Sequence, residues 1–172
     1  EACEGYDTSA KVNPPLRERA DVEAIRAGVA DGTITVLATD HAPHSADEKN
    51  LPFEESPMGM VGLETALGLY REALVETGAI DWPRLIALMT IEPARLCGLD
   101  RCGMGMIGVD GPGDVTVIDP EASWTVDPGT FAGRSRNTPF SGRRLTGRAV
   151  ATIVGGGVAW GYTRSEEHTS EL

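Results

Sequence analysis

Residues Ile34–His44, with the sequence ITVLATDHAPH, join an apolar, β-branched run to a polar end. The first five residues predict a buried strand, and Asp40, His41 and His44 follow directly after it. In barrels of parallel strands with outer helices, the carboxyl ends of the strands carry the catalytic and metal-binding side chains. A carboxylate at such a place can bind a divalent metal ion or act as a general base. The structural alternative is that Asp40 caps a turn fixed by Pro43.

The composition argues against several classes of partner. The chain has 172 residues, which suits a single domain, and a formal net charge of −11. It offers no basic stripe to neutralise phosphates, so we expect no nucleic acid among its partners. Its apolar stretches fall far short of the roughly 20 residues of a membrane span, so we expect no membrane association. Cys3, Cys97 and Cys102 form neither a C-x-x-C motif nor an even disulfide set, which favours a reducing, cytoplasmic location. We expect Cys97 and Cys102 to be core or loop residues rather than metal ligands.

Both ends of the sequence look unnatural. The chain starts at Glu1 and runs directly into patterned sequence, so we expect that part of a domain is missing upstream. Residues 163–172 share no composition with the glycine- and valine-rich segment before them, and resemble the translation of a sequencing adapter. We therefore expect 163–172 to be a non-native tail, which removes His168 from the candidate ligands.

Periodicity and turn residues predict helices in the first hundred residues. We expect helices over 16–30, over 63–74, after a cap at Asp81, and over 92–96. The first should end at Asp31-Gly32, and the third should carry Pro83 in its first turn and turn three side chains inward: Leu85, Ile86 and Met89. Residues 45–59 are polar and contain two prolines, which predicts a long loop of the kind that often covers a site.

After Gly98 the chain becomes rich in glycine and its periodicity changes. We expect a strand over 115–118, then a hairpin of strands 148–154 and 158–160 around the triple glycine at 155–157. No G-K-[ST] motif follows these glycines, which argues against a phosphate loop. We therefore predict an α/β fold in which residues 1–104 form the C-terminal part of a (β/α)8 barrel, and residues 105–162 form a small β-rich appendage.

Motifs in four places carry a family resemblance: KVNPPLR at 11–17, ATDHAPH at 38–44, GLETA at 62–66 and NTPFSG at 137–142. Their combination is similar to the class I dihydroorotases of the amidohydrolase superfamily. The resemblance implies a zinc-dependent hydrolase of (β/α)8 fold that reversibly cyclises N-carbamoyl-L-aspartate to dihydroorotate in de novo pyrimidine biosynthesis. It also implies one or two Zn²⁺ ions, with the remaining ligands upstream of this chain, so that the chain alone would be inactive.

The resemblance implies roles for individual residues. Asp40 matches the metal ligand that also serves as the catalytic acid and base. A carboxylate suits this role, because it can carry a proton from the attacking water to the leaving nitrogen. Asn13 and His44 match positions that bind the substrate, and donors aimed at a carboxylate suit that role. Met58 and Gly59 match a loop pair that closes on the substrate, although the family has phenylalanine where this chain has Met58.

Alternatives to a dihydroorotase remain open. One is a non-catalytic, dihydroorotase-like scaffold for a partner such as aspartate transcarbamoylase. Another is a related cyclic amidohydrolase, an allantoinase or dihydropyrimidinase, which usually lacks counterparts of Asn13 and His44. The presence of Asp40 with both residues favours the enzyme, and an upstream His-x-His pair would decide the question. We expect a small-molecule substrate and consider a homo-oligomer. His41 has no family role, and we expect it to pack or to support the site.

Overall fold

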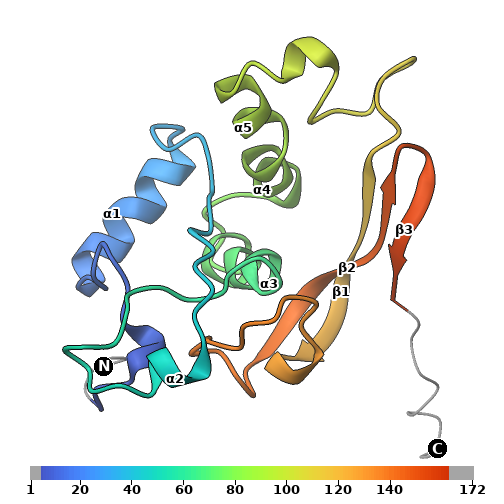
Figure 1. Ribbon diagram of the computed structural model, residues 1–172. Helices are drawn as coiled ribbons and strands as arrows, with labels where there is room; N and C mark the ends of the chain where they lie inside the picture. Colours follow the sequence, from blue (N-terminus) through green and yellow to red (C-terminus); the bar gives the residue numbers. More distant parts are fainter. Residues whose placement is uncertain (1–4, 163–172) are drawn as a thin grey trace, which may run out of the picture.

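The computed structural model describes residues 5–162, in which helices precede a small antiparallel sheet (Figure 1). Cys3, His168 and the expected tail 163–172 lie outside the described residues. The helical elements are η1 (Thr8–Ala10), α1 (Arg19–Ala30), α2 (Ala46–Lys49), α3 (Ala66–Tyr70), η2 (Arg71–Val75), α4 (Trp82–Met89), α5 (Ile91–Leu96), η3 (Asp100–Cys102) and η4 (Pro128–Thr130). The strands are β1 (Val115–Thr125), β2 (Arg144–Val154) and β3 (Gly157–Gly161). Within residues 5–162, none of the helices has the length and apolar character that a membrane span requires.

The predicted helices are confirmed, with boundaries set by their caps. Helix α1 begins three residues later than expected, because Glu18 and Asp21 form a reciprocal capping box at its start. It ends as predicted at Asp31, before Gly32. The Asp81 carboxylate accepts a 2.9 Å hydrogen bond from the Arg84 N–H and caps α4 as expected. The helix expected over 63–74 begins at α3 and continues through the π-helical turn η2.

The helices pack around a first aliphatic core. Its buried members are Val29 of α1, Leu74 of η2, and Leu85 and Leu88 of α4. Leu85 and Leu88 have no exposed surface, whereas Ile86 and Met89, also expected to face inward, are half-buried. This core holds α1 against the α4 region.

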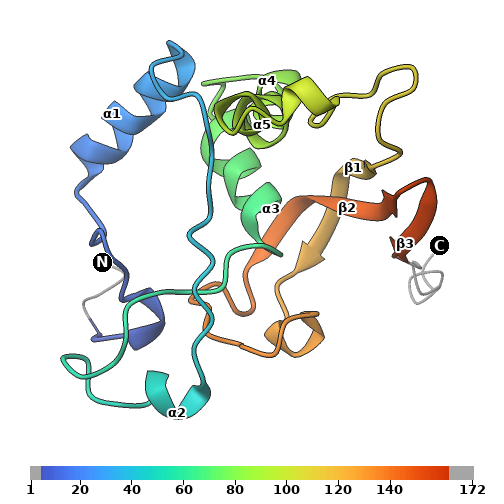
Figure 2. The same ribbon diagram turned by 45° about the horizontal axis from the view of Figure 1, so that its top comes forward.

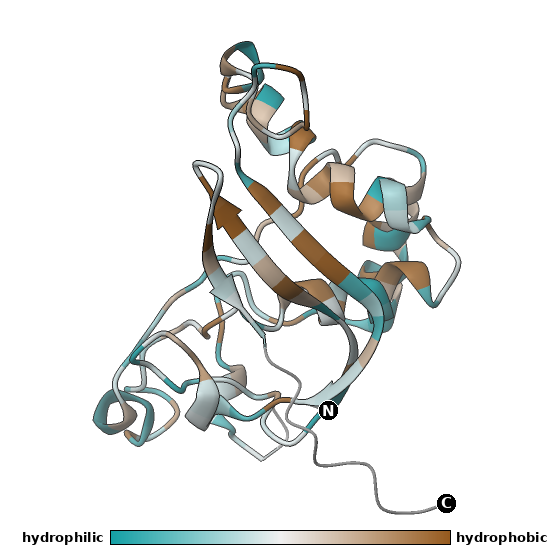
Figure 3. Cartoon of the chain, turned by 90° about the vertical axis from the view of Figure 1, so that its right-hand side faces the viewer, coloured by the Kyte–Doolittle hydropathy of each residue, from teal (hydrophilic) through white to brown (hydrophobic). Residues whose placement is uncertain are grey.

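The sheet has the order β1-β2-β3, and both pairings are antiparallel (Figure 2). The expected strand at 115–118 extends to Thr125, and the expected hairpin is confirmed as β2 and β3. A second core of Val61, Val126, Phe131 and Leu145 packs beneath it. Hydrophobic residues recur along the strands in Figure 3. At Gly68 of α3, an added Cβ would lie 3.0 Å from the Leu145 Cβ, so the helix and the sheet are in close contact.

One prediction of regular structure is wrong. Residues 34–38 form neither a strand nor a buried segment, and they run as an irregular connection between α1 and α2 (Figures 1 and 2). Two of their N–H groups have backbone partners, Ile34 to the Gly28 carbonyl and Leu37 to the Leu88 carbonyl. A strand needs a neighbouring strand to pair with, and the one sheet in the described part of the chain lies elsewhere.

Candidate active site

The segment 39–44 lies beside the segment 58–62. The Ala42 N–H donates to the Met60 carbonyl at 2.9 Å, and a parallel bridge joins His41 to Met60. The His41 Nδ1 accepts a 3.1 Å hydrogen bond from the Gly62 N–H. His41 therefore supports the pairing of the two segments, the kind of role expected for it.

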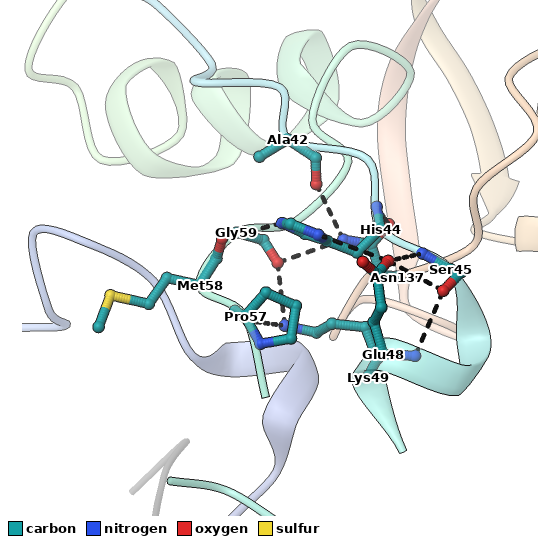
Figure 4. A network of polar contacts seen from close by, with 9 residues as sticks. All are labelled: Ala42, His44, Ser45, Glu48, Lys49, Pro57, Met58, Gly59 and Asn137. Atoms are coloured by element: carbon teal, nitrogen blue, oxygen red, sulfur yellow. Dashed lines mark hydrogen bonds and ion pairs between the residues drawn. The ribbon is translucent and has the colours of Figure 1, made fainter. Parts of the chain in front are cut away.

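The pairing brings together three of the predicted substrate-binding residues. The His44 Nε2 lies 3.0 Å from the Met58 carbonyl oxygen, directly before Gly59 (Figure 4). A carbonyl can only accept, so the proton of this contact lies on Nε2. The other ring nitrogen, Nδ1, lies 3.9 Å from the Glu48 carboxylate. The Met58 side chain is exposed and Gly59 is buried.

Two buried polar side chains that sequence reasoning missed hold this arrangement together. Asn137 is 7% exposed, and its Nδ2 donates to the Ala42 and Gly59 carbonyls at 3.0 and 3.2 Å. Lys49 is 6% exposed and its ammonium group donates to the Pro57 and Gly59 carbonyls at 2.9 and 3.1 Å. Asn137 belongs to the NTPFSG motif, which indicated the family but gave no role for this residue. Lys49 lies in a segment predicted to be a polar loop, and nothing in the sequence around it indicates a buried side chain.

The ammonium groups of two lysines, Lys11 and Lys49, lie against the loop at 53–59. Burial lowers the pKa of Lys49 below its ordinary value, the charge of Lys11 acts in the same direction, and Asp7 opposes both. The Lys11 ammonium group donates to the Phe53, Glu54 and Ser56 carbonyls at 2.6, 3.1 and 2.7 Å. Both cations therefore bind carbonyls of the loop at 53–59.

The same contacts bring the KVNPPLR motif to the site. The Gly59 N–H donates to the Lys11 carbonyl at 2.8 Å, two residues before Asn13. The Asn13 side chain is exposed and makes no hydrogen bond within the described part of the chain. Since both polar groups of the Gly59 backbone have protein partners, a substrate contact with its N–H would require that the bond to Lys11 open.

Asp40 differs from its neighbours in conformation and in contacts. Its φ of 46° is uncommon for a residue with a side chain, although aspartate tolerates it better than most. The side chain is exposed and has neither a hydrogen bond nor an ion pair to residues 5–162. A free carboxylate fits a metal ligand, but it is one ligand only. Among the described residues, no three His, Cys, Asp or Glu side chains lie together so as to hold a metal ion. Cys97 and Cys102 are exposed and belong to neither core; Cys97 directly follows α5, and Cys102 is the last residue of η3.

A cavity of about 410 Å³ lies next to the contacts of Figure 4. His44, Lys49 and Asn137 line it, together with Arg134 and Arg136. The chain as a whole is acidic, so the three basic residues Lys49, Arg134 and Arg136 are a local departure from its charge. Guanidinium, ammonium and imidazole groups suit an anionic ligand.

Comparison with known proteins gives a consistent result. Residues 9–159 match the model of the amidohydrolase family. The chain is 52% identical over 158 residues to the dihydroorotase of Pelotomaculum thermopropionicum, a match that covers 92% of this chain and 36% of that protein. It is 51% identical to the dihydroorotase of Geobacter sp. M21, covering 93% of this chain and 37% of that protein. This chain thus spans little more than a third of the length of these relatives.

Solved structures of hydantoinases are similar in fold. The L-hydantoinase (dihydropyrimidinase) of Arthrobacter aurescens aligns with a TM-score of 0.85 and 27% identity, over 95% of this chain and 37% of that one. The D-hydantoinase (dihydropyrimidinase) of a Thermus species aligns with a TM-score of 0.79 and 28% identity, over 88% of this chain and 34% of that one.

Proposed function

This chain belongs to the amidohydrolase family, and we propose that it is part of a dihydroorotase that interconverts N-carbamoyl-L-aspartate and dihydroorotate in the cytoplasm. The observation that carries the proposal is the identity of about half of all residues with dihydroorotases over more than nine tenths of the chain. The cavity beside His44, which Arg134 and Arg136 also line, supports it, since both compounds are carboxylates.

The fold that goes with this proposal is a (β/α)8 barrel with residues 1–104 as its C-terminal part and residues 105–162 as a β-rich appendage. The similarity to hydantoinases over about a third of their length supports it. In such a barrel, residues 34–38 would gain parallel neighbours on both sides, and Asp40 would lie at the carboxyl end of the strand, where catalytic groups gather.

The proposed cofactor is zinc, in keeping with the general metal dependence of amidohydrolases. A catalytic zinc ion takes about three protein ligands. Asp40 would be one of these, and the others must come from outside the described residues. When bound, the metal ion polarises the substrate carbonyl and activates water.

The residues of this chain have separate tasks in the proposal. The Asp40 carboxylate accepts the proton of the attacking water and delivers it to the leaving nitrogen. Asn13 and His44 bind and orient the substrate carboxylate, and the Met58-Gly59 pair covers it. Such positioning lowers the barrier because the reacting groups no longer have to find one another.

The test replaces Asp40 in a full-length protein, either the natural one or a chimera in which this chain replaces the matching part of the Pelotomaculum dihydroorotase. Asp40→Asn should lower turnover of dihydroorotate by at least about 10²-fold, since the amide cannot take up the proton. Asp47→Asn, at an exposed carboxylate on α2, is the matched control and should retain full activity.

The hydantoinase similarity makes ring-opening of hydantoins the second candidate activity. If the wild-type full-length protein turns over a hydantoin but not dihydroorotate, the hydantoin replaces dihydroorotate as the proposed substrate. A full-length protein inactive on both, yet bound to aspartate transcarbamoylase, would favour the scaffold instead.

A further inference from the structure

Asn137 joins the two segments that carry the proposed substrate-binding residues. Its Oδ1 accepts a 3.1 Å hydrogen bond from the His44 N–H. Its Nδ2 donates to the Ala42 carbonyl at 3.0 Å and to the Gly59 carbonyl at 3.2 Å. One side chain thus fixes the backbone on both sides of the contact between the His44 ring and the Met58 carbonyl (Figure 4).

An asparagine is the side chain of the right size with one acceptor and two donors at its end. The orientation of the amide is unambiguous, because the His44 N–H can only donate and the two carbonyls can only accept. An aspartate would place an oxygen against the Ala42 and Gly59 carbonyls, and an alanine would leave all three groups without Asn137 as partner.

The backbone at Asn137 is itself held in place. Its carbonyl accepts a 3.0 Å hydrogen bond from the Val61 N–H. Val61 lies in the core beneath the sheet, and Phe140 of the same NTPFSG motif packs against that core. The connection between η4 and β2 therefore ties the loops at 42–44 and 58–59 to the sheet.

We propose that Asn137 is a positioning residue of the site: its amide is engaged by His44, Ala42 and Gly59, and it sets the geometry of His44 and Gly59 from the β-rich part of the chain. This inference rests on the proposed function for its substrate. It assigns the NTPFSG motif a task, and it gives the β-rich part a role in building the site.

The test is a double-mutant cycle in the full-length protein, with Asn137→Ala, His44→Ala and the double variant. Asn137→Ala should raise KM for dihydroorotate by about tenfold and leave metal content unchanged, the pattern of lost substrate binding. Because Asn137 acts largely through His44, the fold-increase in KM of the double variant should be well below the product of the fold-increases of the two single variants.

Thr138→Ala is the matched control. Thr138 is as buried as Asn137, and its hydroxyl accepts from the Phe140 N–H within the same turn, without contact to His44 or Gly59. This variant should lower the thermal midpoint and leave KM within about twofold of wild type. If Asn137→Ala fails to fold, Asn137→Asp provides the second variant, since it keeps the size and the acceptor for the His44 N–H.

Two outcomes would show that Asn137 is only a structural residue and would overturn the inference. One is a KM for Asn137→Ala no higher than that of Thr138→Ala, and the other is that the fold-increases in KM in the cycle simply multiply. A full-length protein inactive on dihydroorotate defeats the proposed function instead. The inference is then decided by the imidazole ¹⁵N spectrum of His44: it predicts one tautomer, protonated at Nε2, in wild type and a tautomer mixture in Asn137→Ala. An unchanged spectrum overturns it.

Discussion

Gly59→Ala should disturb the geometry of the site, because the structure leaves no room for a side chain at this position. The Gly59 backbone has a φ of +131°, which residues with a Cβ rarely adopt. A Cβ added there would lie 2.5 Å from the Ala42 Cβ, 3.2 Å from the His44 Nε2 and 3.4 Å from the Ala42 carbonyl oxygen. The alanine therefore requires the segments at 42–44 and 58–62 to separate.

The size of the effect follows from these distances. Carbon atoms in contact prefer a separation of about 3.5–4.0 Å, so the two Cβ atoms would be about 1 Å too close. Overpacking of this kind costs about 1–3 kcal/mol, and the unusual φ adds about 1–3 kcal/mol. Even about 1.4 kcal/mol of this, if expressed as displacement of His44, raises KM for dihydroorotate about tenfold.

The assay compares three glycine variants of the full-length protein by KM and thermal midpoint. Gly78→Ala has a positive φ of +74° with nothing within 4 Å of the new Cβ, so it reports backbone strain alone. Gly133→Ala has open space and no positive φ. We expect Gly59→Ala to raise KM and both controls to leave it unchanged. A Gly59→Ala protein with the KM and midpoint of Gly133→Ala would refute the packing argument.

Three further predictions concern neighbouring features. Asn13→Ala and His44→Ala should raise KM for dihydroorotate in the full-length protein without changing its zinc content, measured by atomic absorption; metal loss would mean that the residue ligates the ion. Burial lowers the pKa of Lys49, so as the pH rises toward 10.5 the unfolded chain holds more protons than the folded one. Stability relative to Lys49→Met should therefore rise over that range in thermal unfolding, and a falling difference would contradict the sign. Residues 1–172 expressed alone should be largely aggregated or partly folded and hold no stoichiometric zinc, which light scattering and metal analysis can check; a cooperatively melting, zinc-bound monomer would oppose this.

The parts of the fold that depend on nearby residues could be predicted from the sequence. Asp81 caps α4 through a residue three positions away, and the hairpin of β2 and β3 follows from its glycine turn. The stretch at 34–38 has the composition of a strand but not its structure, because pairing depends on chain segments that composition does not reveal. Its β-branched residues indicate that the segment can form a strand when other strands lie beside it.

The site divides in the same way. The family resemblance singled out His44, Met58 and Gly59, and the structure brings His44 against the Met58 carbonyl, directly before Gly59. The Asn137 and Lys49 contacts were not predicted. Asn137 reaches the Ala42 carbonyl across 95 positions of sequence and the Gly59 carbonyl across 78, and no local pattern encodes such a partnership.

The contacts of the site are distributed unevenly around Asp40. On its C-terminal side, the backbone of 42–44 is fixed to Met60 and Asn137. On its N-terminal side, the Ala38 carbonyl accepts from the Tyr70 hydroxyl at 2.6 Å, while most peptide groups of 34–38 have no backbone partner in the described chain. Contacts within this chain thus hold together the segments that carry three of the proposed substrate-binding residues, His44, Met58 and Gly59. The metal-binding side would depend on strands that pair with 34–38 and bring further ligands to Asp40, and a barrel supplies both at once.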